Sequence, residues 1–170
     1  MLRHLVILAL LAAVSVTPAR VAAQDRPHSG TLVVVAAPAP PLTLTPADLL
    51  NMPRTKTAFK QPDGRAVVHE GVLVAELLKR AGAPLGKALR GDAMATYVVA
   101  SATDGYRVIF SLAELDPEFT GSEIIVADRT NGQPLLADQG PIRIVAPKDL
   151  AGARSIRMLE RIEVVRLPKP

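Results

Sequence analysis

The sequence contains no cysteine and no tryptophan among its 170 residues. Without cysteine the chain cannot form a disulfide bond, and it offers no thiolate as a nucleophile or a metal ligand. Aromatic residues are also few, with three Phe and two Tyr, so few rings are available on which nucleic acid bases could stack. The fold must therefore be stabilised by an apolar core and by backbone hydrogen bonds.

The net charge is small, and histidines are few. The formal net charge is +4, and no basic stripe is interleaved with aromatic residues, so we expect no nucleic acid partner. The histidines are His4, His28 and His69, and they are scattered along the chain. Zinc sites need several nitrogen or sulfur ligands close together, so the sequence predicts no metal site.

The N-terminus predicts export. Arg3 and His4 precede an uncharged apolar run, Leu5 to Val16, as in a secretory signal peptide. The run is about a dozen residues long, whereas a membrane span needs about 20, so we favour cleavage over an uncleaved membrane anchor. Small residues in Val21-Ala22-Ala23 place the cleavage after Ala23. We therefore expect a periplasmic or secreted protein with no membrane span after cleavage.

The predicted organisation has three parts: a signal peptide over residues 1–23, a flexible N-terminal segment with the first strand over 24–41, and one domain over 42–170. Apolar alternation and turn residues predict strands over 31–35, 54–60, 65–70, 96–102, 106–111, 124–128, 142–146 and 162–166. Helical spacing and start signals predict short helices over 46–51, 73–81 and 112–115. The proline-rich stretch from Ala36 to Pro41 predicts an extended connector. Hairpins outnumber strand-helix-strand units, so the expected fold class is α+β with a mixed or antiparallel sheet and short helices.

Four short motifs follow one another in the second half of this pattern. They are His69-Glu70-Gly71-Val72-Leu73-Val74-Ala75-Glu76-Leu77-Leu78, Asp104-Gly105-Tyr106-Arg107-Val108, Gly140-Pro141-Ile142-Arg143-Ile144-Val145 and Arg154-Ser155-Ile156-Arg157. Each motif is weak alone. The ordered set, followed by a terminal Ile-Glu-Val strand, resembles the molybdopterin-binding fold of sulfite oxidases and their bacterial relatives, over about Thr43 to Val165. The chain looks like a small exported single-domain version of this family.

The resemblance implies a cofactor groove beside the segment from Pro147 to Arg157, which in the family lies against the pyrophosphate and pterin of the cofactor. It implies these cofactor-binding residues: Arg143, Lys148, Gly152, Arg154, Ser155 and Arg157. A phosphate favours backbone amides beside glycine, a hydroxyl donor and a guanidinium fork. The alternative is that the basic residues are solvated surface cations, with Arg143 and Arg157 paired to nearby acids.

The cysteine that binds molybdenum in this family is missing here. By resemblance it would lie near Phe59 to Pro62, where the sequence has a Pro62-Asp63-Gly64 turn instead. Asp63 could offer an oxygen ligand, but a carboxylate after a turn proline is more typical of a turn. The ligand sets both the affinity and the redox potential of a metal. We therefore expect no metal and no cofactor, while the resemblance keeps molybdopterin as an alternative.

The other polar candidates have a structural interpretation that we favour, so we name no catalytic residue. His69 could ligate a metal or transfer protons, but an isolated histidine more often satisfies a local hydrogen-bonding partner. Asp104-Gly105-Tyr106 fits a hairpin turn. The acids Glu114, Asp116 and Glu118 fit helix starts, and their use as an acid and base pair is the alternative.

Three classes of function remain open. We favour a non-catalytic binding module, whose former cofactor groove takes an anionic small molecule or an exported protein partner. The first alternative is a molybdopterin-dependent oxidoreductase with an unusual metal ligand. The second is a purely structural or interaction domain. The missing thiolate weighs against an enzyme.

Overall fold

A computed structural model describes residues 30–60 and 64–169 of the chain. Its strands are β1 (Leu32–Ala36), β2 (Leu42–Leu44), β3 (Thr55–Lys60), β4 (Ala66–Leu73), β5 (Thr96–Ala102), β6 (Arg107–Ser111), β7 (Ile125–Thr130), β8 (Gln133–Pro134), β9 (Arg143–Val145) and β10 (Leu159–Arg166). Its α-helices are α1 (Pro46–Leu50), α2 (Val74–Arg80), α3 (Leu112–Leu115) and α4 (Pro117–Thr120). Short 3-10 helices cover Gly86–Ala88, Gly91–Ala95 and Gly152–Arg154.

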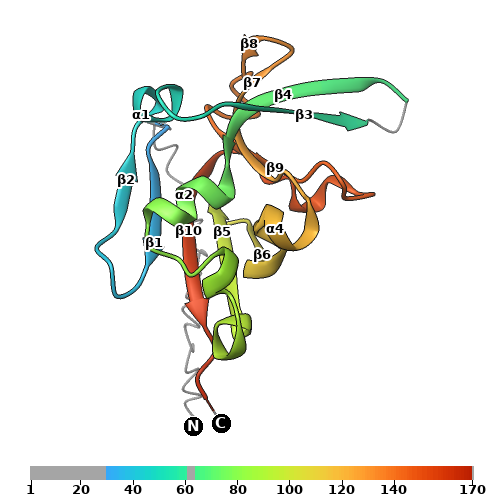
Figure 1. Ribbon diagram of the computed structural model, residues 1–170. Helices are drawn as coiled ribbons and strands as arrows, with labels where there is room; N and C mark the ends of the chain where they lie inside the picture. Colours follow the sequence, from blue (N-terminus) through green and yellow to red (C-terminus); the bar gives the residue numbers. More distant parts are fainter. Residues whose placement is uncertain (1–29, 61–63, 170) are drawn as a thin grey trace, which may run out of the picture.

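The strands form two five-stranded sheets. Sheet A has the order β2-β1-β10-β5-β6, and sheet B has the order β3-β4-β7-β8, with β9 also paired to β7. Strands β1 and β10 run parallel, and the other pairs are antiparallel. Figure 1 shows the long β3–β4 hairpin of sheet B projecting away from sheet A. The predicted α+β class, with mixed pairing and short helices, is confirmed.

In strands β1, β5 and β6 of sheet A, every second residue is buried. In β5 the buried positions alternate from one end to the other, as expected for a strand with one face in the core. Strand β1 contributes Leu32 and Val34, and β10 contributes Ile162, all fully buried. Because β1 lies between β2 and β10, the first strand is part of this sheet rather than of a separate N-terminal segment.

Sheet B depends on one close approach between backbones. At Gly71 in β4 an added Cβ would lie 2.0 Å from the carbonyl oxygen of Val126 in β7, so only glycine fits. The register between the two strands shifts at this glycine, as at a β-bulge. At the other end of β7, Asn131 and Gly132 both have positive φ angles. This conformation is the one that a tight hairpin turn requires, and it returns the chain into β8.

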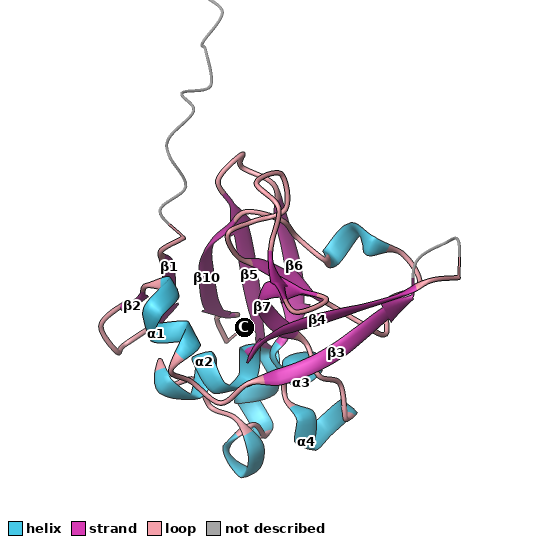
Figure 2. Cartoon of the chain, turned by 90° about the horizontal axis from the view of Figure 1, so that it is seen from above, coloured by secondary structure: helices cyan, strands magenta, loops and turns pink. Residues whose placement is uncertain are grey.

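Two helices begin with a capping box, in which side chain and backbone satisfy each other's hydrogen bonds. Thr45 and Asp48 cap α1 in this way, as their spacing predicts, and Ser111 and Glu114 cap α3. Helix α2 buries Leu77 and Leu78 completely. Seen from above, the four α-helices gather on one side of β10, β5 and β6 (Figure 2).

The structure differs from the predicted elements in a few places. Strands β2 and β8 and helix α4 were not predicted, and neither was the division of the strands between two sheets. The expected extended connector from Ala36 to Pro41 is instead a tight reversal, in which the Ala39 amide donates to the Ala36 carbonyl at 3.1 Å. The predicted signal peptide and the Pro62-Asp63 part of the predicted turn lie outside the described residues. No helix within the described ranges is long and apolar enough to cross a membrane.

Candidate functional site

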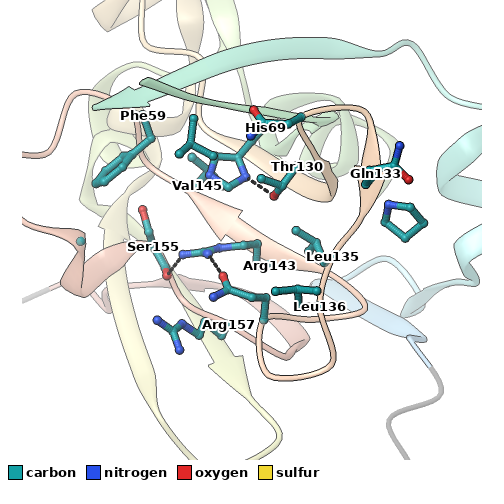
Figure 3. Close-up of a pocket in the computed structure, with 15 residues that line it drawn as sticks. Phe59, His69, Thr130, Gln133, Leu135, Leu136, Arg143, Val145, Ser155 and Arg157 are labelled. Atoms are coloured by element: carbon teal, nitrogen blue, oxygen red, sulfur yellow. Dashed lines mark hydrogen bonds between the residues drawn. The ribbon is translucent and has the colours of Figure 1, made fainter. Parts of the chain in front are cut away.

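A cavity of about 600 Å³ lies against one face of sheet B. Its floor comes from Phe59 of β3, Val67 and His69 of β4, and Arg143 of β9. The loop from 131 to 139 and the segment from 152 to 157 supply the remaining walls. Figure 3 shows Arg143 crossing the middle of the cavity, with His69 above it, Phe59 on one side and Leu135 and Leu136 on the other.

Strand register explains why these side chains share a face. Phe59 lies opposite Val67 in the β3–β4 pair, and His69 lies opposite Thr130 in the β4–β7 pair. Residues that lie opposite each other in an antiparallel pair point to the same face, as do residues two apart along one strand. The sheet therefore brings together residues that are far apart in the sequence.

Arg143 provides a partly buried positive charge at the centre of the cavity. Its Nη2 donates to the carbonyl oxygen of Ser155 at 2.9 Å, and its Nη1 donates to the side-chain oxygen of Gln139. Its Nε is buried and has no hydrogen-bond partner among the described residues. Burial and the nearby charge of Arg157 lower the pKa of Arg143, although Asp138 acts in the opposite direction. The cationic form of Arg143 is thus held in an environment that opposes its charge.

Arg157, Ser155 and Gly152 line the same cavity beside Arg143. Arg157 is exposed, and no carboxylate in the described ranges forms an ion pair with it or with Arg143. Ser155 is only 7% exposed, and its hydroxyl oxygen accepts a hydrogen bond from the Ala146 amide at 3.0 Å. A Cβ on Gly152 would lie 3.8 Å from the Phe59 ring. Four of the six predicted residues therefore meet at one cavity.

The two other predicted residues, Lys148 and Arg154, lie at a separate cavity of about 190 Å³. Arg154 donates to both carboxylate oxygens of Asp149, and to Glu114, at 2.8 Å each, and these hydrogen bonds raise its pKa. Lys148 donates to the Gly121 carbonyl oxygen at 2.9 Å. Lys148 and Arg154 therefore do not line the same cavity as the other four predicted residues. Their side chains instead hold neighbouring segments together.

His69 is buried in the cavity wall, and its Nδ1 lies 3.0 Å from the Thr130 hydroxyl (Figure 3). Burial, and then the charge of Arg143, lower the pKa of His69 to about 4. The imidazole is therefore neutral at pH 7. The local hydrogen bond fits the predicted structural role, but the position of the ring on the cavity wall was not anticipated.

Several lining residues were not named as site residues from the sequence. Phe59 was identified only as the start of the segment corresponding to the missing cysteine, and residues 61–63 of that segment lie outside the described residues. The alternation of Val67 and His69 along one strand is the signal that could have placed them on one face. No comparable signal exists for Leu135 and Leu136, because they lie in an irregular loop.

The acidic cluster has structural roles. Glu114 caps α3, and Asp116 caps α4 and accepts a hydrogen bond from the Gly86 amide at 2.6 Å. Its members therefore begin helices, in agreement with the interpretation from sequence. Across residues 30–60 and 64–169, no group of three or more His, Asp or Glu side chains is arranged to hold a metal ion.

Comparison with known proteins gives the family. The family model for the oxidoreductase molybdopterin binding domain matches residues 19–170, and a search of curated proteins found no match. Among solved structures, the chain is similar to the sulfane dehydrogenase SoxCD from Paracoccus pantotrophus, with a TM-score of 0.64 and 18% sequence identity. The similarity covers 84% of this chain but only 40% of that chain, so this protein spans well under half of its neighbour's length. At this identity the likeness establishes the fold alone. The predicted resemblance is confirmed, and the chain belongs to the family of oxidoreductase molybdopterin-binding domains.

Proposed function

We propose that this protein binds a small anionic molecule in the cavity of sheet B and does not catalyse a reaction. The observation that carries this proposal is the pair formed by Arg143 and Arg157. Both guanidinium groups line one cavity, and within the described part of the chain neither has a carboxylate partner. The predicted signal peptide would place this binding in the periplasm or outside the cell.

The physical reason is electrostatic. A partly buried cation is normally paired, because removing its charge from water costs free energy. Here Arg157 adds a like charge instead. Burial is the larger cause of the lowered pKa of Arg143, and the charge of Arg157 lowers it further. An anion between the two guanidinium groups would offset both effects and would accept charge-assisted hydrogen bonds. The exposed side chain of Arg157 is the donor available for it, and Arg143 adds its positive charge.

The family suggests molybdopterin as the ligand, and the residues fit only part of that group. Arg143, Arg157, Ser155 and Gly152 offer the guanidinium forks, hydroxyl and close backbone that a phosphate favours. The metal is a different case, because the sequence contains no cysteine and therefore no thiolate to bind molybdenum. A pterin phosphate without metal is compatible with this cavity, and a thiolate-bound metal is not.

Thermal unfolding of the purified protein with pyrophosphate tests the proposal. Binding to the folded state alone stabilises it by mass action, by about 1.4 kcal/mol at ten times the Kd. For a chain of this size we expect Tm to rise by about 3 to 6 °C at millimolar pyrophosphate. Arg157→Gln should remove most of the rise without unfolding the protein, because Arg157 is exposed.

Arg107→Gln is the matched control, because Arg107 is also an exposed arginine but lies on β6 of sheet A. It should leave the pyrophosphate response unchanged. No rise in Tm at ten millimolar pyrophosphate would contradict the proposal and favour the purely structural alternative. Stoichiometric molybdenum in the purified protein would instead favour the oxidoreductase alternative.

A further inference from the structure

The charge that faces the cavity is small. Arg143 and Arg157 line the cavity and contribute two positive charges. Asp138 acts against the charge of Arg143 but is exposed and lies outside the lining. His69 is neutral at pH 7, since its pKa is about 4. The lining therefore carries net positive charge, which an anionic group on a ligand complements.

Apolar side chains flank the guanidinium group of Arg143 on two sides (Figure 3). On the sheet, Phe59 packs against the buried cluster that includes Val145, and both residues line the cavity together with Val67. On the facing loop, Leu135 and Leu136 line it. Leu136 is 71% exposed although it belongs to the cavity wall. An apolar ligand body placed here would remove this leucine from water, which stabilises the complex in proportion to the area buried.

The size of the cavity also favours more than a bare anion. Its volume of about 600 Å³ lies within the range of sites that take drug-sized molecules, about 300 to 1,000 Å³. Inorganic phosphate or acetate would leave most of this space filled by water. The arginines and the apolar walls would therefore contact different parts of one ligand.

We infer that the ligand is a small organic monocarboxylate with an apolar body. Its carboxylate lies against Arg143 and Arg157, and its body lies between the Phe59 wall and the Leu135–Leu136 wall. This inference rests on the proposed anion-binding function and specifies the chemical class of the ligand.

The test is a series of straight-chain carboxylates, namely acetate, butyrate, hexanoate and octanoate, measured by calorimetry at pH 7.5. We expect the affinity to rise at least about threefold for each pair of added methylene groups, because burial of methylene groups is favourable. Hexanamide has the same chain without the charge, and it should bind at least about tenfold more weakly than hexanoate, because charge-assisted hydrogen bonds are stronger than neutral ones.

Two variants locate the apolar body. Leu136→Asn should flatten the dependence of affinity on chain length, and it should fold normally because Leu136 is exposed. Phe59→Ala tests the opposite wall in the same way. Leu150→Asn is the matched control, because Leu150 is a fully exposed leucine outside the cavity lining, and it should preserve the wild-type series.

The outcomes separate this inference from the proposal on which it rests. If pyrophosphate stabilises the protein but octanoate binds no more tightly than acetate, anion binding stands and the monocarboxylate class is wrong. If hexanamide binds as well as hexanoate, the class is also wrong. If neither pyrophosphate nor any carboxylate binds, both ideas fail together.

Discussion

His69 is the residue whose environment most directly affects stability as a function of pH. Burial and Arg143 lower its pKa to about 4 in the folded protein, from 6.5 in the unfolded chain. Well above pH 6.5, His69 is neutral in both states. As the pH falls from about 6.5 to about 4, the unfolded state binds the proton first, so the free energy of unfolding decreases. We expect a loss on the order of 2 kcal/mol over this window, measured by urea unfolding at several pH values.

His69→Gln provides the comparison. The variant can keep a hydrogen bond to Thr130 but cannot take up a proton, so its stability should change less between pH 6.5 and 4. At pH 7 it should be at most about 1 kcal/mol less stable than the wild type, the typical net contribution of one hydrogen bond. Identical pH profiles for the two proteins would show that His69 does not control this part of the stability.

At the residue scale, four of the six predicted site residues are close together in the sequence and also line one cavity. Arg143, Gly152, Ser155 and Arg157 lie within one short stretch, and the structure places all four on the same cavity. Sequence could not place the partner of His69, because Thr130 reaches it only through the pairing of β4 with β7. Nor could the sequence show that Arg154 forms an ion pair with Asp149.

At the scale of elements, strands with strong local signals were predictable. The β5–β6 hairpin was foreseen because alternating apolar residues flank an Asp104-Gly105 turn, and the Tyr106 amide indeed donates to Asp104 at 2.9 Å. Strand β8 has only two residues, too few for any alternation to show. The ion pair between Arg54, just before β3, and Asp128, within β7, depends on tertiary structure and leaves no local pattern.

Gly71 gives a prediction at this scale. A Cβ at position 71 would lie 2.0 Å from the Val126 carbonyl oxygen and 2.6 Å from the Ala127 Cα. These contacts are with backbone, so β4 and β7 would have to separate. We expect Gly71→Ala to lower the free energy of unfolding by about 3 kcal/mol, the upper part of the usual range for overpacking, as measured by chemical denaturation.

Gly152→Ala is the appropriate control for that measurement. A Cβ at position 152 would lie 3.8 Å from the Phe59 ring, which is an ordinary van der Waals distance. The free energy of unfolding should therefore change by no more than about 0.5 kcal/mol. If Gly71→Ala were as stable as Gly152→Ala, the close approach of β4 to β7 would not be a requirement of the fold.

At the scale of the whole molecule, the C-terminal strand joins the two sheets and the cavity. Strand β10 lies in the middle of sheet A, between β1 and β5. The segment before it is tied to sheet B, since the Ile144 amide donates to the Ile156 carbonyl at 2.9 Å and the Leu159 amide donates to the Ile142 carbonyl at 3.0 Å. This long-range arrangement is why the sequence predicted the strands but not their division into two sheets.

The position of β10 predicts that a substitution on its buried face destabilises the whole protein. Ile162 is fully buried, and Ile162→Ala should lower the free energy of unfolding by about 3 kcal/mol, as large-to-small core substitutions do. Leu167→Ala, just beyond the strand and exposed, should change it by no more than about 0.5 kcal/mol. Because the cavity segment from 152 to 157 leads directly into β10, unfolding followed at the sheets and at the cavity should occur in one transition for both variants. A cavity that loses its structure before sheet A would show that the two sheets fold as separate units, although buried residues of both sheets, such as Val126 and Ile162, belong to one core cluster.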